Sequence, residues 1–260
     1  MNASKKSLKG FHPLILSVFF CFFAHSAEKY EFKIPVEMTT TEPAQTQDDD
    51  AWRLFFISSI DKFKERKSSR SRLEVANLGD KDKWAQGRWW VFASNLGLLN
   101  SEFPSSTIGV KKIGNLYLYG NLIDNLDFLG GVEEMTNEVA FENNKITSIK
   151  GLSSLKKIKE KLYLNNNKIT SLYGLQNLKT IRSLYIHNNP LLVDISAISN
   201  LEDYGTIYMD DPIRYRLKPK KGSVFCNSIA QKKIRAKVRV ESGSTYKDGP
   251  DLSVYDVCSM

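Results

Sequence analysis

The sequence predicts an α/β solenoid, a fold in which short parallel strands stack beside one another and each strand is followed by a return segment. Two observations predict it. Units of 22 or 23 residues recur between Ile108 and Asp211, starting at positions 116, 139, 162, 184 and 207. The first four units open with two apolar residues separated by a single residue, and an asparagine follows three positions later. A period of this length is typical of stacked repeat proteins.

Residues 1–27 have the pattern of a secretory signal peptide. Lys5, Lys6 and Lys9 precede an apolar run over residues 11–24, and small residues follow up to Ala27, where we expect cleavage. The run is shorter than the roughly 18–20 residues that a spanning helix needs, so a cleaved signal is favoured over a retained anchor. The sequence therefore predicts an exported protein, secreted or periplasmic, with no transmembrane segment after cleavage.

Export changes the inventory of charged and reactive residues. The full chain has 260 residues, a formal net charge of +8 and 42% hydrophobic residues, a composition that excludes the disordered and collagen-like classes. Loss of the three signal lysines leaves 8 − 3 = +5, and the remaining cysteines are Cys226 and Cys258. Two cysteines in an oxidising compartment pair most simply as one disulfide.

The residues before the repeats predict a linker and a helical N-terminal cap. Residues 28–48 are polar and contain two prolines, as a linker would. In the cap region, residues 49–107, the aspartates at 48–50 can cap a helix over residues 51–67, and a second helical stretch is expected after Asp80. The two stretches carry many aromatic residues: Trp52, Phe55, Phe56, Phe63, Trp84, Trp89, Trp90 and Phe92. Such a cluster is more often core than a membrane or partner surface, and here it would cover the first strand.

The repeats occupy residues 108–211. They read LYLYGNLIDNL from Leu116, VAFENNKITSI from Val139, LYLNNNKITSL from Leu162 and LYIHNNPLLVDI from Leu184, and a fifth unit opens with IYM. The pattern LxLxxNxIxxL, followed by LxxLxxI, is that of leucine-rich repeats. One strand per unit predicts a parallel, concave sheet of about five strands.

The repeats resemble two groups within that superfamily. The stretch KITSLYGL from Lys168 is similar to the internalin-type repeats of bacterial surface proteins, and LYIHNNPLL from Leu184 resembles the L domain of cell-surface receptors. Both resemblances imply a secreted, extracytoplasmic recognition module rather than a catalyst.

Strand geometry explains the spacing within a unit. Strand side chains alternate between two faces, so the paired apolar residues point inward and their neighbours point to the open, concave face. The asparagine turns the chain, and its amide can bond backbone groups that the turn leaves unpaired. We therefore interpret one column as structural rather than as a ligand site. It consists of Asn121, Asn144, Asn167 and Asn189.

The open face offers the candidate binding surface. Its central column contains four tyrosines, which are Tyr117, Tyr163, Tyr185 and Tyr208. The next column along the strands consists of Tyr119, Glu142, Asn165, His187 and Asp210. Tyrosine supplies a large rigid contact area at low entropic cost, so a binding surface is the favoured interpretation. The alternative is that the tyrosines stack only on one another and stabilise the sheet.

Residues 212–260 predict a C-terminal cap closed by the Cys226–Cys258 disulfide. Apolar and basic residues alternate over residues 234–240, as in a half-buried strand with one basic face, and five further cations precede Cys226. This basic cap suggests a second hypothesis, an envelope-associated module that binds anionic glycan or lipid. For the basic face itself, a solvated surface without a ligand is the favoured interpretation, because the net charge is modest.

No motif predicts catalysis. After signal cleavage His187 is the sole histidine, and the sequence has no GxSxG, HExxH or Cys/His pattern. We expect no enzyme activity, no cofactor and no metal, and nucleic acid is not an expected partner of an exported chain. The leading hypothesis is an exported module that binds a macromolecule, with a protein of unknown identity as the expected partner, through the tyrosine-lined face. A structural scaffold part is a third hypothesis.

Overall fold

The structure is a computed structural model that describes residues 51–104, 110–202, 205–210, 215–242 and 245–258. The expected signal peptide and linker lie outside these residues. The described residues fall within one compact unit. None of their helices is long and apolar enough to cross a membrane.

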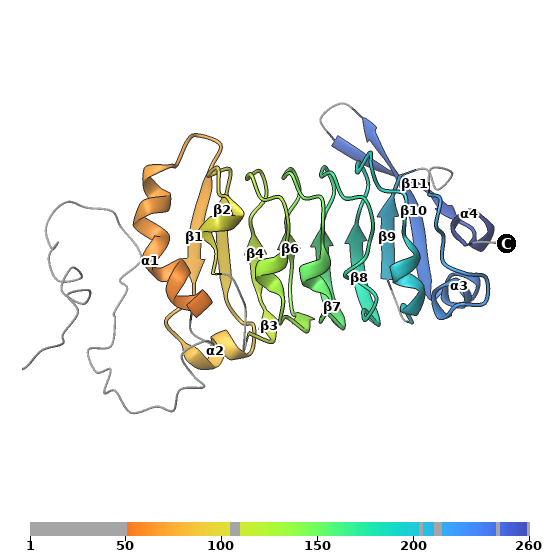
Figure 1. Ribbon diagram of the computed structural model, residues 1–260, viewed down its shortest axis with the longest axis horizontal. Coiled ribbons are helices and arrows are strands. Elements are labelled where there is room, and N and C mark those ends of the chain that lie inside the picture. The colour runs from red at the N-terminus through yellow and green to blue at the C-terminus, as the bar shows by residue number, and fades with distance from the viewer. Residues whose placement is uncertain (1–50, 105–109, 203–204, 211–214, 243–244, 259–260) are drawn as a thin grey trace, which may run out of the picture. The chain divides into compact units, whose positions relative to one another are not determined.

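The N-terminal cap combines two helices with an antiparallel strand pair. Its elements are α1 (Ala51–Glu65), β1 (Arg72–Ala76), α2 (Lys81–Ala85) and β2 (Trp90–Ser94). β1 pairs antiparallel with β2, and β2 pairs in parallel with the first repeat strand (Figure 1). The expected helical cap is therefore a mixed cap, half of whose elements extend the sheet.

The second predicted helix is present only over Lys81–Ala85, and the helical prediction for the aromatic residues after it is wrong. Asp80 caps α2, accepting a hydrogen bond from the backbone N–H of Lys83 at 2.9 Å. Gly87 then adopts a positive φ of 66°, which ends the helix. From Trp89 to Ala93 burial alternates with a period of two, with Trp90 40% exposed between buried neighbours, so this aromatic stretch forms a strand.

The repeat strands follow one another in sequence order. They are β3 (Lys112–Ile113), β4 (Asn115–Tyr117), β5 (Glu134–Met135), β6 (Val139–Ala140), β7 (Lys157–Tyr163), β8 (Thr180–Tyr185) and β9 (Gly205–Met209). Short 3-10 helices provide part of the return side of the coil. They are η1 (Asn100–Glu102), η2 (Asp127–Leu129), η3 (Lys150–Leu152) and η4 (Ser196–Asn200).

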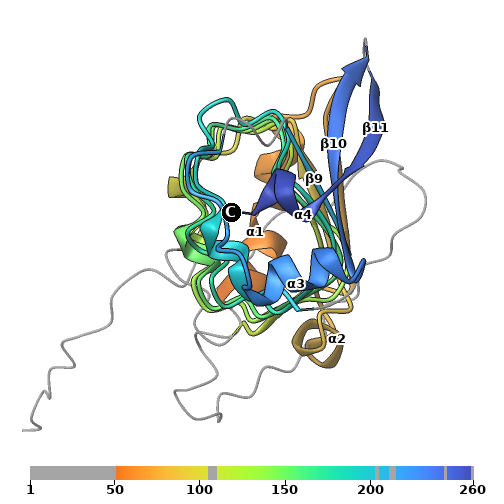
Figure 2. The ribbon, with the colours of Figure 1, turned by 90° about the vertical axis from the view of Figure 1, so that its right-hand side faces the viewer.

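The C-terminal cap begins with α3 (Val224–Ala230) and continues with β10 (Ile234–Ser242), β11 (Thr245–Leu252) and α4 (Val254–Val257). The predicted disulfide between Cys226 and Cys258 is present and joins α3 to the residue after α4. At the C-terminal end of the stack β10, β11, α3 and α4 lie together (Figure 1). Viewed along the stack, β10 and β11 extend beyond the superposed repeats (Figure 2). The cap thus adds both strands and helices after the last repeat.

The sheet is longer than the five strands expected. Its main ladder runs β1-β2-β4-β6-β7-β8-β9-β10-β11, and β3 and β5 form a side branch that joins β7. All pairs from β2 to β10 are parallel, and the two outermost pairs are antiparallel. Each cap contributes a parallel strand next to the terminal repeat and then a hairpin partner. The caps therefore continue the sheet as well as covering its ends.

β2 belongs to a further repeat that the pattern did not reveal. Val91 pairs with Leu116, an offset of 116 − 91 = 25 positions. The same offset relates Leu98 to Ile123, and both side chains are buried. At the position of the ladder asparagine this unit has Leu96, and its length exceeds the period of the others. Because of these two departures, the repeat motif does not match this unit.

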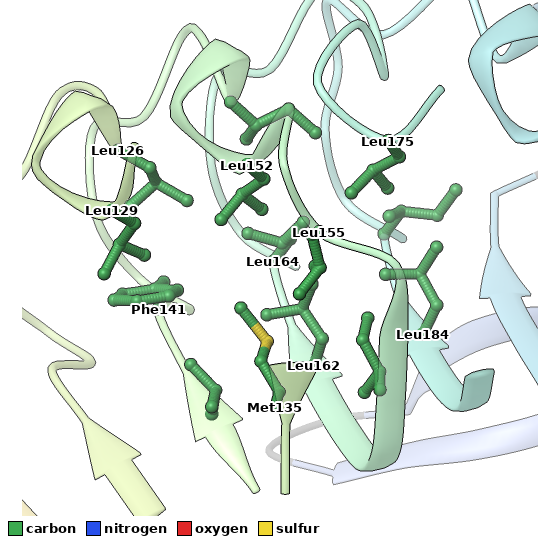
Figure 3. Close-up of a cluster of buried hydrophobic side chains, with 14 of the residues drawn as sticks. Leu126, Leu129, Met135, Phe141, Leu152, Leu155, Leu162, Leu164, Leu175 and Leu184 are labelled. Atoms are coloured by element: carbon green, nitrogen blue, oxygen red, sulfur yellow. The ribbon is translucent and has the colours of Figure 1, made fainter. Parts of the chain in front are cut away.

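Apolar side chains from successive repeats form one continuous core between the sheet and the return segments. In Figure 3, Phe141, Leu162 and Leu164 point toward leucines of the return side such as Leu152 and Leu155. All five side chains are fully buried. Because each unit packs against the next, no unit can bury its apolar side alone.

The asparagine column forms a hydrogen-bonded ladder inside this core. Asn144 Oδ1 accepts from the N–H of Ile123 at 3.1 Å, and its Nδ2 donates to the carbonyls of Leu118 and Phe141, both at 3.0 Å. Asn121, Asn167 and Asn189 bond in the same way. Leu118 O thus accepts from two successive asparagines, Asn121 at 2.8 Å and Asn144 at 3.0 Å. The ladder links neighbouring units through backbone groups.

The residue before each ladder asparagine has a left-handed backbone. Its φ is 68° at Gly120, 57° at Asn143 and Asn166, and 55° at Asn188. Glycine and asparagine tolerate this conformation better than other residues do. In each Gly-Asn or Asn-Asn pair of the repeats, the first residue therefore adopts the left-handed turn and the second forms the hydrogen bonds of the ladder.

Candidate functional site

Three tyrosines of the central column form a continuous stack on the open face. The strand register sets Tyr163 beside Tyr185 and Tyr185 beside Tyr208. The ring centroids lie 4.5 Å apart for the first pair and 4.4 Å apart for the second, with interplanar angles of 16° and 8°. All three side chains remain half-buried. We call Tyr163, Tyr185 and Tyr208 the tyrosine stack. Its rings contact one another and are also partly accessible to a partner.

Tyr117 belongs to a separate aromatic pair. Its ring stacks on Phe92 with centroids 4.1 Å apart, and the Arg72 guanidinium carbon lies 3.5 Å from the centroid of the Phe92 ring. Sequence reasoning missed Phe92 and Arg72 as open-face residues. The signal that could have found Phe92 was the alternation Val91-Phe92-Ala93, which repeats the inward-outward-inward pattern of the later strands.

A polar bridge lies near Ala140, where the aromatic column is interrupted. The hydroxyl of Tyr117 donates to Glu138 Oε2 at 3.0 Å, and Lys161 Nζ lies 2.6 Å from Glu138 Oε1. Burial and this hydrogen bond raise the pKa of Tyr117, and the hydrogen bond to Glu138 raises the pKa of Lys161. At neutral pH the tyrosine is therefore protonated and the lysine charged. Both bonds restrain side chains of the open face.

The next column is less accessible than the strand pattern suggested. Asn165 is 6% exposed and His187 is 2% exposed, so neither is a contact residue in this structure, whereas Tyr119 and Glu142 are partly buried. Burial lowers the pKa of His187 to about 4, with the charge of Arg239 as the second cause, and burial raises the pKa of Glu142 to about 7. Alternation assigns a side chain to a face, but neighbouring side chains decide its exposure.

Asp210 serves a structural role at the end of its column. Its Oδ1 accepts from the backbone N–H of Asn188 at 2.8 Å, and its Oδ2 accepts from that of Asn189 at 3.4 Å. The carboxylate therefore bonds the asparagine turn of the preceding unit. Among the described residues no three His, Cys, Asp or Glu side chains are grouped so that they could hold a metal ion. The expectations of no metal, no cofactor and no catalysis stay predictions.

The basic face of β10 is largely neutralised by β11. Lys237 Nζ lies 3.5 Å from Asp251 Oδ1, and Arg239 Nη1 lies 2.9 Å from Asp248 Oδ1. The Arg239 guanidinium carbon is also about 5 Å from the ring centroids of Tyr185 and Tyr208. The Arg239 guanidinium therefore lies beside the tyrosine stack. Because Lys237 and Arg239 are paired with acids, the net positive charge of this face is lower than the alternating sequence implied.

No protein-family model and no curated protein matches the chain. Among solved structures it is similar to an internalin, InlF, from Listeria monocytogenes, with 20% sequence identity and a TM-score of 0.39. The match covers 79% of this chain and 56% of the internalin chain, so the chain matches little more than half the length of that protein. The repeat pattern, the largely parallel sheet and the asparagine ladder together describe a solenoid that resembles leucine-rich repeats.

Proposed function

We propose that this chain is an exported recognition module that binds a protein partner through the tyrosine stack and the open face around it. The observation that carries the proposal is that the three half-buried rings stack in register on one sheet. Tyrosine is enriched among the residues that dominate binding energy. A surface already ordered by stacking loses little conformational freedom on binding.

The dimensions of the open face suit a protein partner. Seven parallel strands, from β2 to β10, lie side by side. At about 4.8 Å per strand, six intervals span roughly 29 Å, about the diameter of a small domain. The Phe92–Tyr117 pair and the tyrosine stack lie along this length, separated by the strand that carries Ala140. A folded partner could contact both aromatic groups at once.

Export supports a partner outside the cytoplasm. The pattern of residues 1–27 is that of a cleaved signal, and the Cys226–Cys258 disulfide suits an oxidising compartment. We therefore place the mature chain in the periplasm or in the secreted fraction. The sequence pattern and the disulfide are independent observations with the same implication.

Site-specific cross-linking tests the proposed face. A photoreactive benzoylphenylalanine is placed at Tyr185, within the stack, or at Tyr173, which is 57% exposed and lies outside the column. The substitution keeps an aromatic ring, so the stack is expected to remain. Irradiation should give a discrete protein adduct from position 185 and none from position 173. The same adducts from both positions, or none from position 185, would refute the proposal.

An affinity measurement with the identified partner completes the test. The triple variant Tyr163→Ala, Tyr185→Ala, Tyr208→Ala should bind at least tenfold more weakly, because one hot-spot aromatic contributes about 2 kcal/mol. The control variant Tyr173→Ala, Tyr255→Ala removes two exposed tyrosines that belong to neither column. Its affinity should equal that of the wild type, and urea unfolding of each variant verifies that the fold is kept.

A further inference from the structure

A hollow of about 580 Å³ opens beside Tyr208, at the C-terminal end of the open face. Ser183 and Thr206 line it and lie side by side on β8 and β9. In the same row, Lys161 precedes Ser183 and Arg235 follows Thr206. Because Ser183 and Thr206 are short and the neighbouring Arg235 is long, the surface is recessed above these two positions.

The charged lining of the hollow is basic. Arg182, Lys232, Lys233 and Arg235 line it, and no carboxylate does. Arg182 pairs with Glu160, with 3.3 Å between Nη1 and Oε1. Among the described residues the other three cations have no acidic partner, and all three are exposed. Unneutralised like charges gathered at a recess create a positive potential that attracts anions.

We propose that this hollow binds an acidic segment of the protein partner, with Asp or Glu carboxylates set against Lys232, Lys233 and Arg235. The inference rests on the proposed protein-binding function and adds the chemistry of the partner. Guanidinium and ammonium groups bond carboxylates with charge-assisted hydrogen bonds. Charges beside an aromatic contact also speed association and fix its orientation.

Continuity with the tyrosine stack favours a protein over a glycan or a lipid surface. Tyr208 belongs to the stack and also lines the hollow. A partner that covers the stack therefore reaches the hollow within the same interface. The remaining cations of β10, Lys237 and Arg239, are paired with acids of β11, so on this strand the free positive charge is confined to Arg235 at the hollow.

Anisotropy titration with a fluorescein-labelled hexaglutamate peptide tests the hollow, using the mature disulfide-bonded protein. The test variant is Lys233→Gln, Arg235→Gln. The matched control is Lys220→Gln, Lys221→Gln, which removes the same charge from two exposed lysines that line a separate hollow. At low ionic strength the test variant should bind the peptide about fivefold more weakly than the control, as expected for the loss of two exposed ion pairs.

Three outcomes would overturn the inference. Equal weakening in both variants would show that binding follows net charge alone. Preference of the hollow for a sulfated hexasaccharide or for phosphatidylglycerol vesicles over hexaglutamate would assign it to a glycan or a lipid. Finally, the cross-linked partner could bind the tyrosine triple variant more weakly but bind the Lys233→Gln, Arg235→Gln variant as tightly as the wild type. That result would leave the proposed function intact and show that the hollow is not part of the interface.

Discussion

Substitution of a single ladder asparagine, Asn167→Ala, should strongly destabilise the protein. Asn167 Oδ1 accepts from the N–H of Ile146 at 3.1 Å, and its Nδ2 donates to the carbonyls of Phe141 at 3.0 Å and Leu164 at 3.1 Å. All these groups are buried. Alanine can replace none of the bonds, and a buried polar group without a partner is costly.

The magnitude follows from counting what each backbone group retains. Ile146 N–H loses its acceptor, which costs about 1–3 kcal/mol. Phe141 O keeps the bond from Asn144, and Leu164 O keeps the bond from Asn189, so each carbonyl loses one of two donors at about 1 kcal/mol. The expected loss in the free energy of unfolding is therefore about 3–5 kcal/mol.

Urea unfolding at neutral pH, followed by circular dichroism with the disulfide intact, measures the loss. The matched control is Asn177→Ala, which makes the same chemical change at an exposed site where Nδ2 donates to Ser153 O at 2.8 Å. The control should cost less than about 1 kcal/mol. If the two variants differ by less than about 1 kcal/mol, the ladder does not stabilise the fold as argued.

Two further predictions concern pH and the disulfide. Because the pKa of Glu142 is raised from 4.5 to about 7, the folded protein holds a proton that the unfolded chain has released, and stability falls as pH rises between these values. In urea unfolding, Glu142→Gln should therefore be more stable than the wild type by about 3 kcal/mol above pH ~8 and should differ little from it near pH ~4. Equal gains in stability at both pH values would exclude this role of Glu142. Because the pKa of His187 is lowered to about 4, its contribution makes stability rise with pH between pH 4 and pH 6.5. This contribution is the same in the wild type and in Glu142→Gln. Reduction of Cys226–Cys258, separated by 32 residues, should cost about 3–4 kcal/mol, whereas the double alanine variant should not respond to reductant.

The repeating core of the fold could be read from the sequence because its signals are local. The two inward positions of each strand, such as Leu162 and Leu164, follow from alternation within three residues. The register of the tyrosine stack follows from the repeat pattern, since equivalent residues of successive units lie beside one another on adjacent strands. The cysteine pairing needed only the count of cysteines outside the expected signal peptide.

The caps were less predictable because their strands depend on partners far along the chain. The stretch after Gly87 lacks the ladder asparagine, and only its pairing with the first repeat strand identifies it as a degenerate unit. Aromatic residues there suited a helix as well as a strand. The edge of the neighbouring repeat, which offers free backbone groups to a parallel strand, selected the strand.

The sequence by itself determined the solenoid, the inward and outward faces of its strands and the position of the tyrosines. Only the tertiary structure decided which outward side chains are accessible and which charges are free. His187 is buried although it lies on the open face, and Arg239 is paired with Asp248 whereas Arg235 meets no acid among the described residues. Exposure and charge pairing depend on contacts between residues distant in the sequence, and a local pattern does not encode those contacts.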